Sequence, residues 1–400
     1  MPTNTKDRVS ILTARRDLKM AGSAHAYVRG STVQFYEWLV AEHGTVVPSG
    51  PPVWICGDCH LGNLGPIADV KGRVEIAIRD LDQTVIGNPA HDLIRLGLSL
   101  AMAVRGSDLP GVTTALALEQ IIEGYSSALA ADRFEDFGKI PKPIRQILKQ
   151  AYKREWRHLA EERIENVKPS IPLGEKFWKL AAAEQRAIRD LFDDPEVRRM
   201  VTSLKSRKDD AKIHVVDAAY WMKGCSSLGR LRYAILVRVG KKHASDLSII
   251  DIKQATKVAA PQTPNAGMPR NNAARVVEGA TKLSPALGER MLATKLLGRE
   301  VFLRELLPQD LKLEFDQLSC GDAVAAGRYL ASVVGKAHGR QMSPADRKTW
   351  RAALNRQHTK GVDVPSWLWR SVVDLVATHE SAYLDHCRQY ALTRTTIASK

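Results

Sequence analysis

The chain has 400 residues, and 44% of them are hydrophobic, which is enough to fill the core of one large domain or two smaller ones. The sequence lacks a run of about eighteen apolar residues that could span a bilayer, and its first residues carry charges where a signal peptide needs an apolar segment. Five scattered cysteines do not resemble the dense pairing of a secreted disulfide scaffold. We therefore expect a cytoplasmic protein without a membrane span.

Lys and Arg outnumber Asp and Glu by 59 to 44, which gives a formal net charge of +15. This excess favours a polyanionic partner such as a nucleotide, a nucleic acid or a membrane surface, although it is also compatible with basic residues spread over a solvated surface. Basic residues cluster at 139–163 and 198–212 without the aromatic pattern of single-strand binders. Nucleic acid is thus a possible partner, but not the favoured one.

The first half of the chain is predicted to be mainly helical. Residues 7–42 have helical periodicity, and the apolar runs at 53–56 and 74–78 predict two buried strands on either side of a polar loop. Residues 92–105 again have the apolar period of a helix, with Asp92 placed to cap or anchor its start. Further helices are expected through about residue 205.

Strand patterns dominate from residue 213 to residue 305. Residues 218–240 and 289–306 are typical of hairpins, residues 247–255 of a third strand, and residues 271–283 of one embedded helix. The sequence therefore predicts five strands in this region.

Helical periodicity returns after Pro308, notably at residues 321–340 and 366–390. This order predicts an α+β fold in three parts. Residues 1–210 would hold the catalytic and metal-binding loops of a large lobe, residues 211–308 a small β-rich nucleotide-binding lobe, and residues 309–400 the helices that complete the large lobe.

The segment with the most chemistry is GDCHLGN at residues 57–63, followed by DLD at residues 80–82. Two carboxylates and an amide from neighbouring strand ends suit Mg²⁺ with nucleotide phosphates, because this ion takes oxygen ligands. A further carboxylate without metal could orient a hydroxyl nucleophile. The alternative is that these Asp and Asn residues serve turns and helix caps, where such residues are common.

The patterns G-D-x-H-x-x-N, D-x-D and G-N-P-x-x-D-L resemble, in order and spacing, the aminoglycoside phosphotransferase and choline kinase branch of kinase-like proteins. The resemblance implies that Asp58 is the catalytic aspartate and that Asn63 and Asp80 are metal ligands. Asp82 would assist with the metal, and Asp92 would be a buried anchor of the catalytic loop.

Cys56 stands where that family has the first histidine of its loop, and two other interpretations involve this residue. The pattern C-x-x-C-H at residues 56–60 matches the attachment signature of c-type haem, but such attachment needs export. A zinc site made of Cys56, Cys59 and His60 lacks a second ligand pair. We favour buried thiols.

A kinase-like site also needs a flexible hairpin over the phosphates and a lysine on a strand. The segment KGCSSLG at residues 223–229 can supply the hairpin, and Lys253 lies on the next strand among isoleucines. Glu278 would pair with Lys253, and residues 305–308 would form the hinge that binds adenine. The residues expected to bind ATP are Gly224, Ser226, Ser227, Gly229, Lys253, Glu278, Glu305 and Leu306.

The order of these parts is not that of ordinary kinases, because the small lobe follows the catalytic loop. A circular permutation would account for it, since residues 321–340 resemble the helix that normally leads into that loop. The whole arrangement resembles a bacterial family, domain of unknown function 2252, with its K-M-x-x-S-x-x-x-[FY]-x-R-G motif at residues 19–30. Its G-S-x-G hairpin is matched only loosely. Arg29, in the first motif, could bind phosphate or substrate, or pair with an acidic core residue.

These observations lead to the expectation of an ATP- and Mg²⁺-dependent phosphotransferase acting on a hydroxyl of a small molecule or a protein. Transfer of AMP on the same fold is a variant. The alternative from another class is a nucleotide-binding pseudokinase or a basic scaffold that binds nucleic acid or a protein partner. The sequence does not identify the acceptor.

Overall fold

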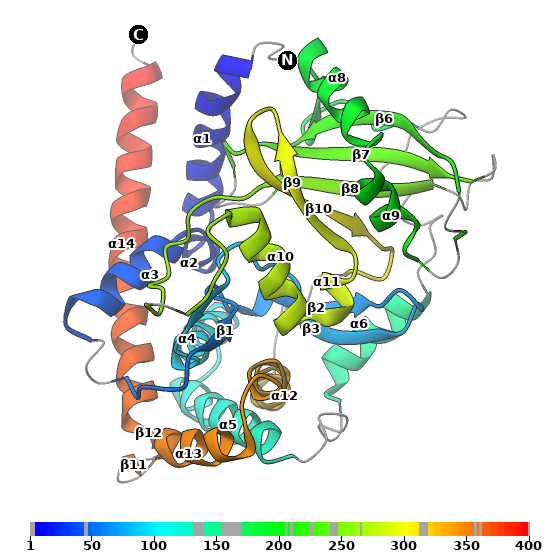
Figure 1. Ribbon diagram of the computed structural model, residues 1–400. Helices are drawn as coiled ribbons and strands as arrows, with labels where there is room; N and C mark the ends of the chain where they lie inside the picture. Colours follow the sequence, from blue (N-terminus) through cyan, green and yellow to red (C-terminus); the bar gives the residue numbers. More distant parts are fainter. Residues whose placement is uncertain are drawn as a thin grey trace.

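The computed structural model describes residues 5–43, 47–131, 140–153, 170–204, 207–208, 211–223, 228–240, 247–264, 266–311, 319–355, 358–359 and 362–398. The protein is α+β, with 53% helix and 18% strand, and a six-stranded sheet lies beside a larger helical part (Figure 1). Among the described helices, none combines the length and the apolar character that crossing a membrane requires.

The large sheet is antiparallel throughout, with the strand order β5-β6-β7-β8-β10-β9. Its strands are β5 (Phe177–Trp178), β6 (Ile213–Trp221), β7 (Arg232–Val239), β8 (Leu247–Gln254), β9 (Met291–Leu296) and β10 (Arg299–Leu306). The five strands expected between residues 213 and 305 are present. The sixth, β5, was not predicted, because two residues are too short to show a strand period.

The turn between β9 and β10 is built from Leu297 and Gly298, which have φ angles of 51° and 71°. Two consecutive residues with positive φ match the twist of the flanking strands, and glycine adopts this conformation without a steric penalty. The expected hairpin at residues 289–306 is therefore confirmed.

The two faces of the large sheet differ in chemistry because side chains alternate along each strand. Apolar residues such as Tyr233, Ile250 and Leu303 pack on one face against α1 (Thr5–Ala21), α8 (Ala182–Leu191) and α9 (Pro195–Thr202). The opposite face presents Arg232 and Lys253, which are direct neighbours on β7 and β8. This polar face is turned toward α10 (Asn272–Leu283), the helix expected at residues 271–283.

Two small sheets connect the large sheet to the helices. β1 (Val53–Ile55) pairs with β4 (Val85–Gly87), and β2 (Leu64–Ala68) pairs with β3 (Val74–Ile78). The strands expected at residues 53–56 and 74–78 thus exist, but they belong to different sheets. The difference arises because each of them pairs with a short strand that the sequence did not reveal.

The helical part has α4 (Ala90–Gly106) at its centre, almost entirely buried. Next to it, α5 (Gly111–Ala130) and α12 (Cys320–Gly339) cross closely at Gly124, where a β-carbon would lie 2.0 Å from the backbone oxygen of Arg328. The other helices are α2 (Ala24–Gly30), α3 (Thr32–Trp38) with a π-helical turn at Leu39–His43, α6 (Lys142–Lys153), α11 (Pro285–Gly288), α13 (Pro344–Leu354) and α14 (Ser366–Ala398). A short pair, β11 (His358–Thr359) and β12 (Val362–Pro365), precedes α14.

Candidate functional site

The polar loop after β1 is fixed by the buried carboxylate of Asp92. This carboxylate accepts hydrogen bonds from the backbone amides of Cys56 at 2.7 Å and Gly57 at 2.9 Å. Gly57 has a φ of 74°, and a β-carbon there would lie 2.1 Å from the backbone oxygen of Gln83, so only glycine fits. Asp92 therefore has the anchoring position that the resemblance implied.

The end of α12 lies directly beside this loop. His338 Nε2 is 3.2 Å from Asp92 Oδ2, and its Nδ1 is 2.9 Å from the Tyr125 hydroxyl. Gln341, just beyond the helix, accepts a hydrogen bond from the amide of Trp54 and donates one to its carbonyl, at 2.8 and 3.0 Å. The helix expected at residues 321–340 thus ends where the polar loop begins.

Asp58 forms a buried ion pair that sequence reasoning missed. Arg95 Nε donates to Asp58 Oδ1 at 2.9 Å, and Arg95 Nη2 donates to the carbonyl of Val28 at 2.6 Å. His60 Nε2 lies 3.9 Å from the other carboxylate oxygen of Asp58. The available signal was an arginine among the apolar residues that follow Asp92 in helix α4.

Asn63 and Asp80 lie at the same end of the pair formed by β2 and β3. The amide of Arg79 donates to the carbonyl of Asn63 at 2.7 Å, which extends the ladder of these strands by one step. The Asn63 side chain donates to the carbonyl of Asp58 at 2.9 Å, and Cys56 Sγ lies 3.5 Å from the carbonyl of Asp80. The two segments singled out in the sequence are therefore adjacent.

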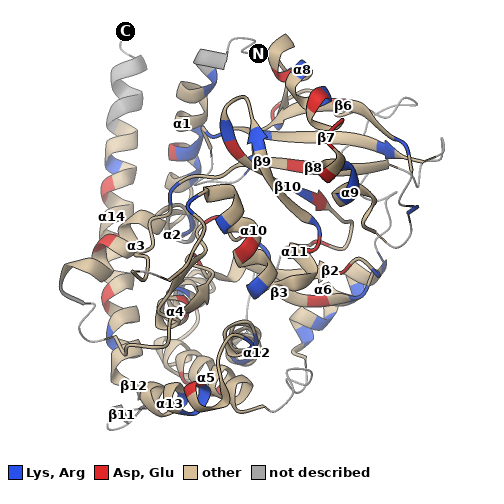
Figure 2. Ribbon diagram, viewed as in Figure 1, with Lys and Arg blue, Asp and Glu red and all other residues tan. Residues whose placement is uncertain are grey.

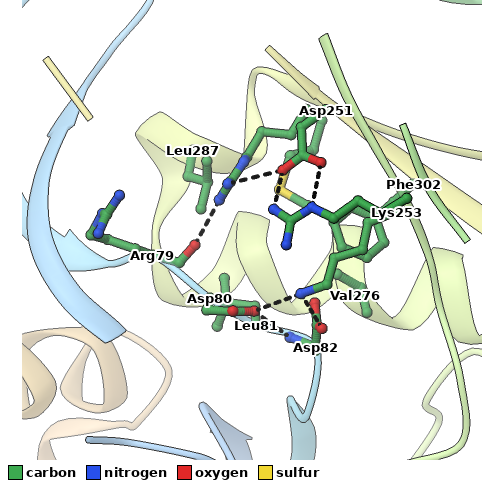
Figure 3. Close-up of a pocket in the computed structure, with 12 residues that line it drawn as sticks. Arg79, Asp80, Leu81, Asp82, Asp251, Lys253, Val276, Leu287 and Phe302 are labelled. Atoms are coloured by element: carbon green, nitrogen blue, oxygen red, sulfur yellow. Dashed lines mark hydrogen bonds and ion pairs between the residues drawn. The ribbon is translucent and has the colours of Figure 1, made fainter. Parts of the chain in front are cut away.

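Lys253, on the polar face of the large sheet, reaches across to the aspartates of the D-x-D segment (Figure 3). Its ammonium forms an ion pair with Asp82 and lies 3.6 Å from Asp80 Oδ1. The Lys253 side chain is 7% exposed, whereas that of Asp80 is 46% exposed. Residues more than 170 positions apart thus meet at one place, and the carboxylate of Asp80 remains accessible.

The pKa values of the two aspartates move in opposite directions. Burial acts to raise the pKa of Asp80, but the charges of Lys253 and Arg304 outweigh it and hold this pKa well below its usual range. Burial and the nearby charge of Asp80 raise the pKa of Asp82 to about 6. Oδ1 of Asp82 is buried and has no hydrogen-bond partner among the described atoms. This oxygen is available to a ligand donor or a cation.

A second group of charges lies beside Lys253 on the same face of the sheet. Asp251 accepts two hydrogen bonds from Arg232, at 2.9 and 2.6 Å, and lies 3.4 Å from Nη2 of Arg304. Burial opposes ionisation of Asp251, but these two guanidinium groups lower its pKa well below the usual range. The D-x-K spacing in β8 was the available signal, since it places Asp251 and Lys253 on one face.

These charged groups line a small pocket between the large sheet and the D-x-D segment (Figure 3). Charged side chains come from both the large sheet and the D-x-D segment, and apolar side chains complete the lining. The lining residues are Arg79, Asp80, Leu81, Asp82, Arg232, Asp251, Lys253, Val276, Leu287, Met291, Phe302 and Arg304. In small-molecule sites, convergent polar groups fix the orientation of the ligand.

Residues 8–389 match the model of a bacterial family described as "Uncharacterized protein conserved in bacteria (DUF2252)". The chain belongs to the DUF2252 family. The match confirms the resemblance carried by the motifs at residues 19–30 and 57–63, and the description names no reaction. No curated protein and no solved structure matches the chain, so no relative supports the kinase-like resemblance.

In this DUF2252 protein Glu278 does not have the role expected of it. Within the described residues, the carboxylates that pair with Lys253 are those of Asp82 and Asp80, and Glu278 is not among them. The residue of α10 that contacts the D-x-D segment is Arg275, which donates to the carbonyls of Asp82, at 3.1 Å, and Thr84. The expected pairing was wrong because Lys253 extends toward the D-x-D segment rather than toward α10.

The predicted hinge is also used differently from the expectation. The carboxylate of Glu305 is buried and accepts from Arg207 at 2.7 and 2.9 Å and from the Ser248 hydroxyl. Its backbone carbonyl accepts from Arg290 at 2.7 Å, and its amide donates to the Arg290 carbonyl at 3.2 Å. Leu306 is buried opposite Ile249 in the sheet. The polar backbone groups of Glu305 are therefore engaged within the chain.

The glycine-rich hairpin is described only at its end. Gly224, Ser226 and Ser227 lie outside the described residues. Gly229 has a φ of 96° in the turn before β7, and no atom would meet a β-carbon there within 4 Å. Cys56 and Cys59 are free and buried, as expected.

The described residues contain no group of three or more His, Cys, Asp or Glu side chains arranged to hold a metal ion. Oxygen atoms suited to Mg²⁺ are present nonetheless on Asp80, which is partly exposed, and on Asp82, whose Oδ1 has no partner. Two carboxylates are a common protein contribution where phosphates and waters complete the shell of this ion. The donor set therefore fits Mg²⁺ bound together with a phosphate ligand, but not a metal site made by protein alone.

Proposed function

We propose that this protein is an ATP- and Mg²⁺-dependent phosphotransferase of the kinase-like fold, circularly permuted so that its nucleotide-binding sheet follows its catalytic loop. The observation that carries the proposal is the contact of Lys253 with Asp82 and Asp80 across the pocket. It joins a buried cation on a strand to two carboxylates after another strand. In a kinase-like site the phosphates need a cation such as Lys253, and Mg²⁺ needs carboxylates, and the two kinds of partner approach the nucleotide from opposite sides.

Each residue then has a role that follows from its charge and position. Lys253 binds the α and β phosphates, and Asp80, Asn63 and Asp82 hold Mg²⁺, which neutralises charge on the phosphates when bound. Asp58 orients the acceptor hydroxyl. The hydroxyl oxygen forms a bond to the γ phosphorus, the bond from that phosphorus to ADP breaks, and the hydroxyl proton passes to Asp58.

The ion pair with Arg95 supports this role for Asp58. A buried guanidinium keeps the carboxylate in one orientation, and it leaves Oδ2 without a hydrogen bond from Arg95. The permuted order is supported by the position of α12, whose end lies next to the loop at Asp92 and Trp54. In a permuted chain these segments are neighbours in space although they are far apart in sequence.

The distribution of Lys and Arg over the described residues gives less support to the alternative, a basic scaffold that binds nucleic acid. Figure 2 shows Lys and Arg on several of the described helices and strands of both parts in this view. A nucleic-acid scaffold would concentrate them along one groove or face.

The test is ATP binding by isothermal titration calorimetry, with and without Mg²⁺, on the wild type, Asp80→Asn and Lys253→Ala. Lys295→Ala is the matched control, since Lys295 lies on β9 of the same sheet and is exposed. We expect Mg²⁺-dependent binding that each site variant weakens by about ten-fold or more and that the control leaves unchanged. Absence of ATP binding under all metal conditions contradicts the proposal, as does binding that neither site variant weakens.

If ATP binds as expected, labelled nucleotide separates the remaining possibilities. Transfer of a label from the γ phosphate supports phosphotransfer, whereas transfer from the α phosphate identifies AMP transfer. Binding without any transfer or hydrolysis identifies a pseudokinase. A protein that ignores ATP but binds nucleic acid, with an affinity that falls steeply with salt, is the basic scaffold.

A further inference from the structure

A group of hydrogen-bond donors without acceptors lies beside Asp58, outside the pocket lined by Lys253. Arg29, in the last turn of α2, and His60, in the polar loop, converge on Gly62. A β-carbon at Gly62 would lie 3.0 Å from Arg29 Nη2 and 3.2 Å from His60 Cε1. The absence of a side chain at Gly62 is therefore what allows the guanidinium of Arg29 to approach the loop.

Arg29 has no ion pair or hydrogen bond through its side chain within the part of the chain that the structure describes, although it is half-buried. Arg95 is completely buried. Its Nε donates to Asp58 and its Nη2 donates to the carbonyl of Val28, but its Nη1 has no partner among the described atoms. Nδ1 of His60, also buried, has none either.

Leaving such donors without an acceptor lowers the free energy of unfolding. A buried donor without an acceptor loses its hydration without compensation, and native structures satisfy nearly all of them. Arg95 Nη1 and His60 Nδ1 are two such buried groups near one carboxylate, and the half-buried guanidinium of Arg29 lies beside them at Gly62. A ligand with acceptor oxygens would satisfy them.

The charges decide the kind of ligand. Arg95 engages Asp58, and no carboxylate of the described residues forms an ion pair with Arg29. His60 lies beside this pair, with Nε2 3.9 Å from Asp58 Oδ2, and its Nδ1 is a further polar group without a partner among the described atoms. Guanidinium groups favour carboxylate and phosphate oxygens, which they bind in a planar, bidentate arrangement.

We propose that Arg29, together with Arg95 and His60, binds an acidic group, phosphate or carboxylate, of the acceptor whose hydroxyl lies at Asp58. The inference rests on the proposed function and narrows its substrate class. The acceptor is then an anionic hydroxyl compound, such as a sugar phosphate or a hydroxy acid, rather than a cationic amino alcohol. This assigns Arg29 a ligand instead of an acidic core residue as its partner.

The experiment measures binding of inorganic phosphate and, separately, acetate to the full chain without nucleotide, by calorimetry at constant ionic strength. The variants are Arg29→Gln, Arg29→Lys and Lys253→Ala. Arg388→Gln is the matched control, because the side chain of Arg388 is 73% exposed on α14. We expect phosphate or acetate to bind the wild type, Arg29→Gln to weaken binding about ten-fold or more, and Arg29→Lys to weaken it less. The control leaves it unchanged, and Lys253→Ala reports whether any of the binding lies at the proposed nucleotide site. The anion that binds more tightly identifies the acidic group.

Two outcomes overturn the inference. One is that neither anion binds the wild type at millimolar concentrations; the other is that binding is lost in Lys253→Ala but kept in Arg29→Gln, which places the anion with the nucleotide. Urea unfolding of Arg29→Gln checks folding, and we expect no loss of stability because an unpaired charge is removed. The measurement needs no ATP, so the two proposals can fail separately. If the protein does not bind ATP but binds phosphate in a way that depends on Arg29, the proposed function is refuted and this anion site is not.

Discussion

Replacing Asp92 by Asn tests how the polar loop is held, because the side chain keeps its shape and loses its charge. The carboxylate accepts hydrogen bonds from the amides of Cys56 and Gly57 on different oxygens, and His338 lies beside one of them. An Asn side chain has one oxygen, so its NH₂ group must face one of these donors. A buried donor left unsatisfied costs about 1–3 kcal/mol, and the remaining bond loses its charge assistance, about 1 kcal/mol more. We expect a loss of about 2–4 kcal/mol.

Urea unfolding followed by circular dichroism at pH 7.5 measures this loss, and hydrogen exchange of a peptide covering residues 53–63 locates it. The control is Asp193→Asn, since the Asp193 side chain is 78% exposed and its ion pair with Arg198 lies on the surface. We expect the control to change stability by less than about 0.5 kcal/mol. The anchoring role of Asp92 is refuted if Asp92→Asn unfolds at the same urea concentration as the wild type and exchange of the loop amides is not faster.

Two further predictions concern the helical part. Gly124→Ala should destabilise the protein by about 1–3 kcal/mol or more in thermal or urea unfolding, because the new methyl group would meet the backbone of Arg328 and force α5 away from α12. The control is Gly111→Ala at the start of α5, where the methyl group meets no atom within 4 Å and should not lower the stability. Equal effects of the two substitutions would contradict the close crossing of α5 and α12. Burial lowers the pKa of His379 to about 4, below its unfolded value of 6.5. As the pH falls, the unfolded chain therefore binds the proton before the folded chain does. The stability that neutral His379 contributes is present above pH 6.5 and is lost as the pH falls toward 4. Over that range the wild type should lose about 3 kcal/mol more than His379→Leu, measured as urea midpoints at several pH values, and parallel curves would show that His379 does not titrate this way.

Much of the local structure was predictable because it depends on patterns within one segment. The hairpin at β9 and β10, the helix α10 and the buried helix α4 follow from alternation, turn residues and helical period. The two-residue strand β5 and the partners of β1 and β3 were not predictable in this way. Their pairing is decided by which backbone edges the tertiary fold leaves free. β4 and β5 are too short to carry a period, and β2 (LGPIA) contains glycine and proline, which argue against a strand.

The candidate site shows the same division. Asp92 could be assigned as an anchor through the resemblance of its G-N-P-x-x-D-L motif, whereas Arg95 could not be assigned to Asp58 without knowing that α4 passes beneath the loop. Glu278 was chosen for Lys253 from proximity in sequence. The contacts with Asp80 and Asp82 instead depend on how the sheet faces the helical part.

The pairing of Lys253 with the aspartates also has a consequence for ligand binding. In the ligand-free protein these charges satisfy one another, so a nucleotide must separate Lys253 from Asp82 before each finds its own partner. The cost of separation is recovered only if both sides are satisfied together, the ammonium by phosphate and the carboxylates by a cation. ATP without Mg²⁺ would satisfy Lys253 and leave two carboxylates facing phosphate oxygens. The same geometry that supports a nucleotide site therefore requires that binding depend strongly on the metal.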